Sequence, residues 1–332
     1  MTDVLTFTPE ERLKIDHTGD RYFDHLGYQS VVLKNERIVL PDRGTSNILV
    51  INKNGEFQSA VEKGRGPGEI LDAYNFTKTK DGGIFTFDQK NDKILEFDSQ
   101  LNLVQELIPP PFENTSIRYV YDLNETLVFE LTSFGFLDNP DLEKKKIFVQ
   151  YFPSSEEYGK RWSVKDKPYA ILRVDGRAVG AGQVPFTYDQ LTAYNPENNS
   201  LFIFGTNTNK ITEIDAEYDT LSVVKVSLPV EPVNQAELDS LKGDNRSEQW
   251  KTMKELVPEV KSPADKMMYY DGEFWLKSNL RGNHIKWFVL NRNGEVLRVV
   301  QLPKESILMH VSEEHLGVRL DDVTFALYEN PK

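Results

Sequence analysis

The chain of 332 residues contains no cysteine. Disulfide bonds, thiolate nucleophiles and cysteine-ligated zinc are therefore excluded. Acidic side chains exceed basic ones and give a net charge of −13, so no nucleic-acid partner is expected, because phosphate binding needs a basic surface. No apolar run reaches the roughly 18 residues of a membrane-spanning helix, and we expect no transmembrane segment.

The N-terminus also lacks the pattern of a secretory signal. No basic residue precedes a long apolar core near Met1, as a signal peptide requires. Two locations remain open. We expect the periplasm or the cell surface if a signal has been removed, and the cytoplasm if Met1 is the natural start.

Aromatic residues are abundant, with 14 Tyr and 19 Phe, which favours a strand-rich fold. Glycine and proline gather between Gly64 and Gly68, with Pro67 inside this stretch. Proline lacks a backbone donor and glycine loses entropy on ordering, so a tight loop between two strands is predicted here.

Short apolar strands that follow a turn recur along the chain. Their second residues are Ile38, Ile84, Leu127, Leu201, Phe274 and Val318. The intervals are 46, 43, 74, 73 and 44 residues. Three of them match the roughly 40–50 residues of a four-stranded propeller blade, and the two long ones add an insertion of about 30 residues.

Each copy has one strand before it and two after it. We therefore predict an all-β fold, a six-bladed β-propeller of four-stranded blades in one domain over residues 1–332. The sixth copy ends near Tyr328, before an outer strand. We expect Val4–Phe7 to supply that strand and to close the ring between the N- and C-terminal strands, since closure protects the sheet edge.

Only one stretch predicts helix. Between Pro232 and Val257, apolar Trp250 and Met253 fall at helical spacing with Val257. Asn234 can cap the first helical piece and Gly243 can end it. We expect a helical insertion at about residues 227–265, between the fourth and fifth blades.

The connections divide between two faces of the predicted ring. The turns from first to second strand and from third to fourth strand share one face, here named the turn face. The loops from second to third strand and the connections between blades share the other, the long-loop face. The long insertions, residues 133–145, 166–187 and 227–265, all fall on the long-loop face. Long loops on a rigid scaffold commonly carry binding sites, so we expect the site there.

Two motifs carry a resemblance to known families. Residues 64–69 read Gly-Arg-Gly-Pro-Gly-Glu, and a late strand with Trp275 follows the turn Asp271-Gly272. The first motif, followed by the Asp81-Gly82 turn, resembles an NHL repeat. Together they more closely resemble the six-bladed propellers of Bacteroidetes and related bacteria, with distant similarity to TolB-like propellers. The resemblance covers nearly the whole chain and implies the propeller fold. Many members of that group look like exported lipoproteins encoded near polysaccharide-uptake systems, and the group has no single known activity.

Strand and loop ends that should converge at the channel carry cations and tyrosines. The candidate ligand-binding residues are Arg65, Glu69, Tyr74, Arg118, Tyr188, Lys266, Tyr269 and His310. All but His310 are expected at the mouth on the long-loop face, and His310 lies on the last inner strand. In an acidic protein they predict a locally cationic, aromatic mouth that suits an acidic small molecule or a uronate-type sugar. The alternative is that Arg65 and Glu69 bridge blades and that the tyrosines pack between blades.

Neither a cofactor nor a metal is expected. The five histidines show no His-x-x-x-His spacing. The inner strands offer mostly Tyr, Val, Met and Thr, which counts against a channel calcium ion like that of gluconolactonase-like propellers. Residues 176–182 share only glycine content with a phosphate cradle and predict a flexible loop.

Two hypotheses for the function follow. The first is a non-catalytic binding or scaffold propeller that engages a small ligand, glycan or protein on the long-loop face. The second is a lactonase- or lyase-type enzyme that acts at the channel mouth. The absence of a catalytic motif such as Gly-x-Ser-x-Gly favours the first.

Overall fold

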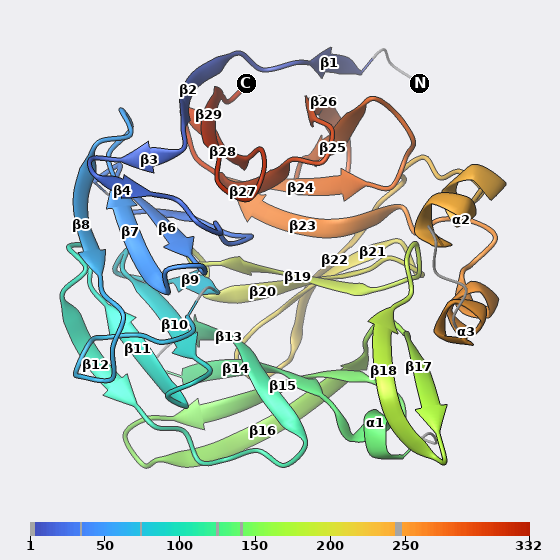
Figure 1. Cartoon of the computed structure of the whole chain (residues 1–332), viewed down its shortest axis with the longest axis horizontal. Coiled ribbons are helices and arrows are strands. Elements are labelled where there is room, and N and C mark those ends of the chain that lie inside the picture. Colours follow the sequence, from blue (N-terminus) through green and yellow to red (C-terminus); the bar gives the residue numbers. More distant parts are fainter. Residues whose placement is uncertain (1–3, 34, 74, 124–125, 140–141, 243–247) are drawn as a thin grey trace.

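The computed structural model describes residues 4–33, 35–73, 75–123, 126–139, 142–242 and 248–332. Six β-sheets stand around a common centre (Figure 1). In each blade one strand lies innermost, and the strands that follow it in the chain lie successively outward as antiparallel neighbours. The predicted all-β, six-bladed propeller is confirmed.

The first three blades follow the chain in order. Blade one contains β5 (Val31–Val32), β6 (Ile38–Asp42), β7 (Asn47–Ile51) and β8 (Phe57–Val61). Blade two contains β9 (Phe76–Lys78), β10 (Ile84–Asp88), β11 (Lys93–Phe97) and β12 (Leu103–Leu107). Blade three contains β13 (Thr115–Leu123), β14 (Thr126–Ser133), β15 (Lys145–Phe152) and β16 (Glu157–Lys165).

The remaining blades complete the circle. Blade four contains β19 (Gln190–Asn195), β20 (Ser200–Gly205), β21 (Lys210–Ile214) and β22 (Thr220–Lys225). Blade five contains β23 (Ala264–Tyr270), β24 (Glu273–Ser278), β25 (His284–Leu290) and β26 (Val296–Pro303). Blade six contains β27 (Ile307–Val311), β28 (His315–Arg319) and β29 (Phe325–Glu329).

The place of a strand within its blade follows from its sequence. All five residues of β6 are buried, because adjacent blades cover both faces of this apolar strand. The end of the outer strand β16 instead alternates, with Trp162 and Val164 half-buried against blade four and Ser163 between them exposed. Apolar clusters between neighbouring blades thus form the core, in place of one central cluster.

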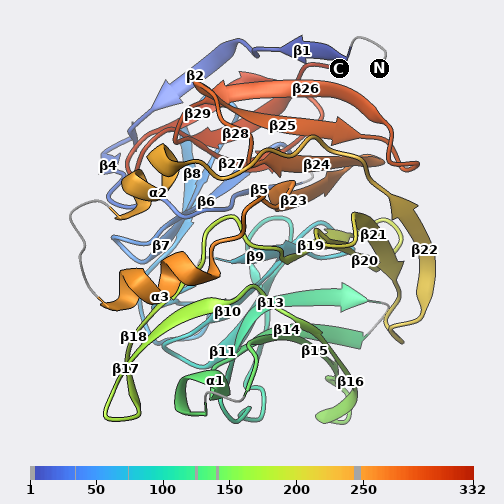
Figure 2. The same ribbon diagram turned by 90° about the vertical axis from the view of Figure 1, so that its right-hand side faces the viewer.

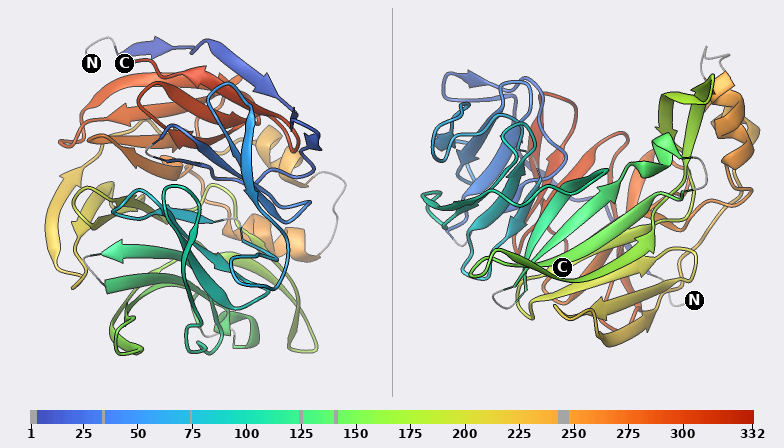
Figure 3. Two further views of the ribbon diagram at one scale, coloured as in Figure 1. Left: turned by 90° about the vertical axis from the view of Figure 1, so that its left-hand side faces the viewer. Right: turned by 90° about the horizontal axis from the view of Figure 1, so that it is seen from below.

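An N-terminal strand closes the ring, as predicted, but it is not Val4–Phe7. The fourth strand of blade six is β2 (Glu11–Ile15), which pairs antiparallel with β29. Leu13 and Ile15 of β2 pack on the cluster between blades six and one. This contact favours β2 as the outer strand of blade six. The earlier β1 (Leu5–Phe7) pairs in parallel with β26 as a fifth strand of blade five. Figure 3 (left) shows this N-terminal segment along the outside of both blades, before the short hairpin of β3 (His17–Thr18) and β4 (Arg21–Tyr22).

Three insertions gather on the long-loop face (Figure 2). They are α1 (Gly135–Asp138) in blade three, the hairpin of β17 (Tyr169–Val174) and β18 (Arg177–Gln183), and the helices α2 (Gln235–Lys242) and α3 (Glu248–Leu256). Arg173 of the hairpin donates hydrogen bonds to the carbonyls of Phe136 (2.9 Å) and Leu137 (2.8 Å) in α1. The helical insertion is confirmed. The prediction of a flexible loop at residues 176–182 is wrong, because residues 177–182 belong to the strand β18.

The helical insertion is fixed by polar contacts. Asn234 and Glu237 cap α2 reciprocally, each side chain accepting a hydrogen bond from the other's backbone N–H at 2.9 and 3.1 Å. The buried Lys261 pairs with Glu231 at 2.6 Å and also with Glu237, which ties α2 to the chain before blade five. The predicted helix end at Gly243 lies outside the described residues. Over the described residues, no helix has the length and apolarity needed to span a membrane.

Two carboxylates at the ends of second strands hold connections of the long-loop face. Asp88 accepts hydrogen bonds from the backbone N–H groups of Leu71 (2.7 Å) and Lys90 (3.1 Å), and so joins the blade connection to the next turn. Asp42 binds the backbone N–H of His25 in the same way at 3.0 Å. These acids therefore satisfy backbone donors of the fold.

Candidate functional site

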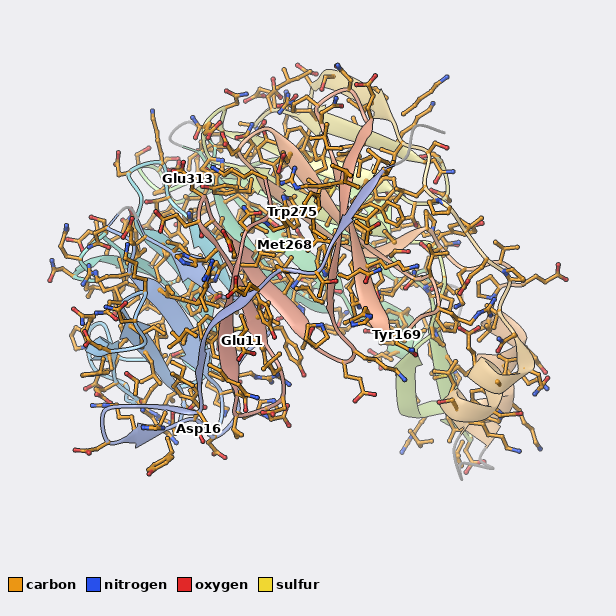
Figure 4. The ribbon with its side chains drawn as sticks, turned by 90° about the horizontal axis from the view of Figure 1, so that it is seen from above. Glu11, Asp16, Tyr169, Met268, Trp275 and Glu313 are labelled. Carbon is orange, nitrogen blue, oxygen red and sulfur yellow. The ribbon has the colours of Figure 1, made fainter. Side chains whose placement is uncertain are left out.

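A cavity of about 450 Å³ lies where the central channel opens on the turn face, and we name it the turn-face cavity. Part of its wall comes from the junctions between first and second strands, through the turn residues Glu36, Lys80, Glu197 and Glu313 and the strand end Tyr270, of five different blades. Figure 4 shows Glu313 on one side of the ring and Tyr169 on the other, with Met268 of the inner strand β23 between them. Tyr169 belongs to the hairpin on the long-loop face. The cavity therefore lies on the face opposite to the one favoured from the sequence.

His310 brings an imidazole to the wall of the turn-face cavity. A β-bulge between Leu308 and His310 interrupts the pairing of β27 with β28, and bulges re-aim side chains. His310 Nδ1 lies 2.5 Å from Ser30 Oγ of blade one. The residue is 4% exposed, and its Nε2 has no hydrogen-bond partner in the described part of the chain.

Gly317 lies opposite His310 in the pairing of β27 with β28 and makes room for the ring. A Cβ atom at Gly317 would lie 2.1 Å from Cε1 of the imidazole, which no side chain tolerates without movement of the ring. Burial lowers the pKa of His310 to about 3, and the positive charges of Lys78 and His315 contribute further. His310 is therefore neutral at pH 7, and its Nε2 can donate or accept one hydrogen bond, depending on the tautomer.

Lys78 places an amino group at the same cavity. It ends β9 between the buried Thr77 and Thr79. Among the described residues, no hydrogen-bond acceptor or carboxylate contacts its Nζ. Burial lowers the pKa of Lys78, and no neighbouring charge of the described residues counters this effect. A desolvated ammonium group without a partner is unfavourable, and a bound anion would offset that penalty.

The rim of the cavity carries both signs of charge. Lys53 pairs with Glu36 at 3.2 Å and approaches Glu314 at 3.8 Å. The side chains of Lys80 and Glu197 are exposed and have no hydrogen bond or ion pair within the described ranges. No group of three or more His, Asp or Glu side chains that could hold a metal ion occurs among the residues that the structure describes.

Two predicted site residues, Arg65 and Glu69, lie in the glycine-rich loop of residues 64–69. Glu69 Oε2 accepts a hydrogen bond from the backbone N–H of Gly66 at 2.7 Å. A Cβ on Gly64 would lie 1.9 Å from that oxygen, so a side chain at this position would displace the Glu69 carboxylate. Arg65 is exposed and has no partner within the described residues. Neither side chain forms the bridge between blades that was the alternative interpretation.

Lys266 lies at the start of β23, on the long-loop side of the channel. Its Nζ donates hydrogen bonds to the backbone carbonyls of Leu308 (2.8 Å) and Tyr28 (3.3 Å). Burial, with a smaller effect of the Lys277 charge, lowers the pKa of Lys266 to about 8. The amine thus caps the inner edge of the adjacent blade.

Two more predicted residues belong to the same face. Arg118 is half-buried on β13, and Tyr188 is 47% exposed in the connection to blade four. Within the described part of the chain, no hydrogen bond or ring contact joins these two side chains to each other or to Lys266. Tyr74 lies outside the described residues.

Tyr269 does not lie at the long-loop mouth, and that placement was wrong. It is the last but one residue of β23, which begins on the long-loop face and ends at the turn face. Its hydroxyl accepts a hydrogen bond from Arg292 at 3.1 Å, and its ring centroid lies 4.7 Å from that of Phe202. Tyr269 therefore packs between blades four and five, which was the alternative interpretation.

Sequence reasoning identified His310 as a channel residue but missed Lys78, Lys80 and Glu197. One signal was available for Lys78. On an inner strand, the neighbours that share its face are Phe76 and Lys80, and neither can neutralise a lysine. The exposed turn residues Lys80 and Glu197 carried no signal, because charged residues are common in surface turns.

Part of the chain matches a known family. Residues 26–157 match the sequence profile of DUF5128, described as a 6-bladed beta-propeller. The match spans blades one and two and the first three strands of blade three. It confirms the resemblance to six-bladed propellers that was inferred from residues 64–69. No curated protein sequence matches the chain.

Solved structures share the fold at low sequence identity. A candidate exported protein from Bacteroides fragilis is 14% identical, with a TM-score of 0.55 and 99% of each chain covered. A member of the DUF4221 family from Bacteroides vulgatus is 10% identical, with a TM-score of 0.57 and 97% of each chain covered. A candidate gluconolactonase is 14% identical, with a TM-score of 0.52, and the match covers 99% of this chain and 94% of that one. At these identities the likeness shows the propeller fold alone.

Proposed function

We propose that this propeller binds a small organic anion in the turn-face cavity and does not convert it chemically. The observation that carries the proposal is the amino group of Lys78. It lines a cavity of about 450 Å³ and has no partner among the described residues. A carboxylate bound there would gain a charge-assisted hydrogen bond and would remove the penalty of the desolvated cation.

The electrostatics of the whole chain support this reading. The net charge is −13, and the buried lysines Lys93 and Lys261 are neutralised by carboxylates, Lys93 by Glu106 at 2.8 Å and Lys261 by Glu231 at 2.6 Å. A partly buried lysine without such a partner creates a local positive site in an acidic protein. Small pockets with one well-placed charge select ligands by that charge.

The proposal moves the site from the long-loop face to the turn face. On the long-loop face, Glu69 and Asp88 bind backbone N–H groups, and Lys266 binds carbonyls. These polar atoms are already used within the fold. A glycan or protein partner on the long insertions is the competing proposal, and a Lys78 variant separates the two because Lys78 lies on the opposite face.

The test is a thermal-shift screen with aliphatic, hydroxy, aromatic and uronic acids at pH 7. We expect at least one acid to raise the melting temperature of the wild type and of the control Lys63→Met, an exposed lysine of the long-loop face. Lys78→Met should keep its circular dichroism spectrum and lose the shift. The proposal fails if no acid stabilises the wild type, or if Lys78→Met responds as the wild type does.

A second candidate function is a lactonase- or lyase-type reaction in the same cavity. The observation that favours it is His310, which lines the cavity and leaves Nε2 without a partner among the described residues, because imidazole is the side chain most often used in general acid–base catalysis. Incubation with a panel of aldonolactones, followed by release of acid, tests this function. Turnover that is lost in His310→Asn, with ligand binding retained, would favour the enzyme over the binding protein.

An exported location belongs to the proposal as well. The support is the likeness to the exported candidate from Bacteroides fragilis and the resemblance to exported propellers. Fractionation of cells that express the gene at its natural locus would test it, and recovery in the cytoplasm would contradict it.

A further inference from the structure

We propose that the ligand of the turn-face cavity is a zwitterion of the length of a di- or tripeptide, with its carboxylate at Lys78 and its ammonium group at Glu197. This inference rests on the proposed function and names the class of ligand for that same site. It comes from the separation of positive and negative charge around the cavity wall.

The positive side of the cavity is formed by blade two. Lys78 and Lys80 both line it, and neither has a carboxylate partner in the described part of the chain. The charge of Lys78 acts on His310, so these two side chains are near neighbours. This side can therefore accept a carboxylate without first breaking an ion pair.

The negative side is formed by blades four, five and six around Tyr270. Burial raises the pKa of Tyr270, and the negative charges of Asp271, Glu313 and Glu197 raise it further, which places these carboxylates close to one ring. Glu313 is also 3.3 Å from Lys332, whereas Glu197 has no partner within the described residues. An ammonium group would find its free carboxylate at Glu197.

The turn that carries Glu197 is held in place by its neighbours. Asn195 is fully buried, and its Oδ1 accepts a hydrogen bond from the backbone N–H of Glu197 at 3.1 Å. Pro196 between them also lines the cavity. The backbone of Glu197 at the rim is therefore held in place before any ligand arrives.

A separate observation points to a peptide-like ligand. His310 is almost fully buried, lines the same cavity and leaves Nε2 without a partner in the described structure. A peptide group offers both a donor and an acceptor, so it can satisfy Nε2 in either tautomer of the imidazole. Buried polar atoms are usually satisfied, and a bound peptide group would complete this one.

The size of the cavity limits the length of the ligand. A sphere of 450 Å³ is about 10 Å across, and each extended residue spans about 3.3–3.6 Å. Two or three residues therefore place both termini inside one cavity, at opposite sides of its wall.

The test is isothermal titration calorimetry at pH 7 with Ala-Ala and Ala-Ala-Ala, their N-acetylated forms and their C-terminal amides. We expect a free peptide to bind the wild type at least about tenfold more tightly than either capped form, because each cap removes one charge interaction. Glu197→Gln should abolish the preference over the acetylated form, and Lys78→Met the preference over the amide. The control Glu113→Gln, at an exposed loop residue, should keep both preferences. Lys78→Gln replaces Lys78→Met if the latter does not fold.

The outcomes separate this inference from the proposed function. If simple carboxylic acids bind but free and acetylated peptides bind equally, the zwitterion is refuted and anion binding stands. The same holds if Glu197→Gln still prefers the free peptide. If neither the peptides nor the acids of the thermal-shift screen bind, both proposals fail.

Discussion

Acidification should destabilise the folded protein through His310. Burial lowers the pKa of this histidine to about 3, compared with 6.5 for an unperturbed side chain. Between these two values the unfolded chain binds a proton that the folded chain does not bind. The free energy of unfolding therefore falls as the pH falls from about 6.5 towards 3.

The size of this effect follows from the two pKa values. A proton bound only by the unfolded state lowers the free energy of unfolding by about 1.4 kcal/mol per pH unit. Between pH 7 and pH 5 the contribution of His310 is about 2 kcal/mol, because most of that interval lies below the unfolded pKa. Carboxylates add their own pH dependence, so the informative quantity is the difference from a variant without the imidazole.

His310→Asn is the suitable variant, because its amide keeps a hydrogen-bond partner near Ser30 but does not titrate. Urea denaturation at pH 7, 6 and 5 measures the free energy of unfolding of both proteins. The stability advantage of the wild type over His310→Asn should shrink by about 2 kcal/mol from pH 7 to pH 5. His284→Asn, at an exposed residue of β25 whose side chain has no partner among the described residues, is the control and should follow the wild type. Parallel pH profiles of wild type and His310→Asn would refute the reasoning.

Three further outcomes follow from the packing. Gly317→Ala should lower the free energy of unfolding by about 1–3 kcal/mol, because the methyl group collides with the His310 ring. In urea denaturation, His310→Ala should cost less in the Gly317→Ala background than in the wild type, and strict additivity would contradict the contact. Deletion of residues 1–15 should lower the melting temperature by several degrees more than deletion of residues 1–8, because β2 covers β29 whereas Leu5 of β1 is 65% exposed. Calorimetry measures both melting temperatures, and equal losses would count against the role of β2. Lys261→Met should speed limited proteolysis between residues 231 and 261, because Glu231 and Glu237 lose their buried cation. Lys63→Met is the control. An unchanged cleavage rate in Lys261→Met would show that α2 is held by other contacts.

The fold could be predicted because each blade repeats one local pattern. An apolar second strand follows a turn, as around Ile38 and Ile84, and the spacing of such strands counts the blades. The missing outer strand of the last blade also predicted closure by an N-terminal strand. The choice of strand could not be read locally, because it depends on the packing of Leu13 and Ile15 against the cluster between blades six and one.

The turn-face cavity could not be predicted in the same way. Its wall combines strand residues with short turns, and a short turn carries little sequence signal about what lies across the channel from it. The position of His310 on an inner strand was visible, but the bulge and the space left by Gly317 depend on pairing between strands. Lys78 lacks a partner because no described residue around it brings a carboxylate or another acceptor to its Nζ. This depends on the arrangement of the other blades and not on the sequence next to Lys78.

The pairing of β2 with β29 has a consequence for synthesis. Tyr328 pairs with Glu11 across 317 residues of chain, so β2 leaves the ribosome long before its partner exists. At a translation rate of about 5–20 residues per second, this wait is roughly 15–60 s. During that time Leu13 and Ile15 can pack on blade one but lack the blade-six part of their cluster, and the growing ring keeps an unpaired edge of the kind that favours aggregation. The half-made propeller with a free N-terminal strand is therefore the form on which a chaperone would act.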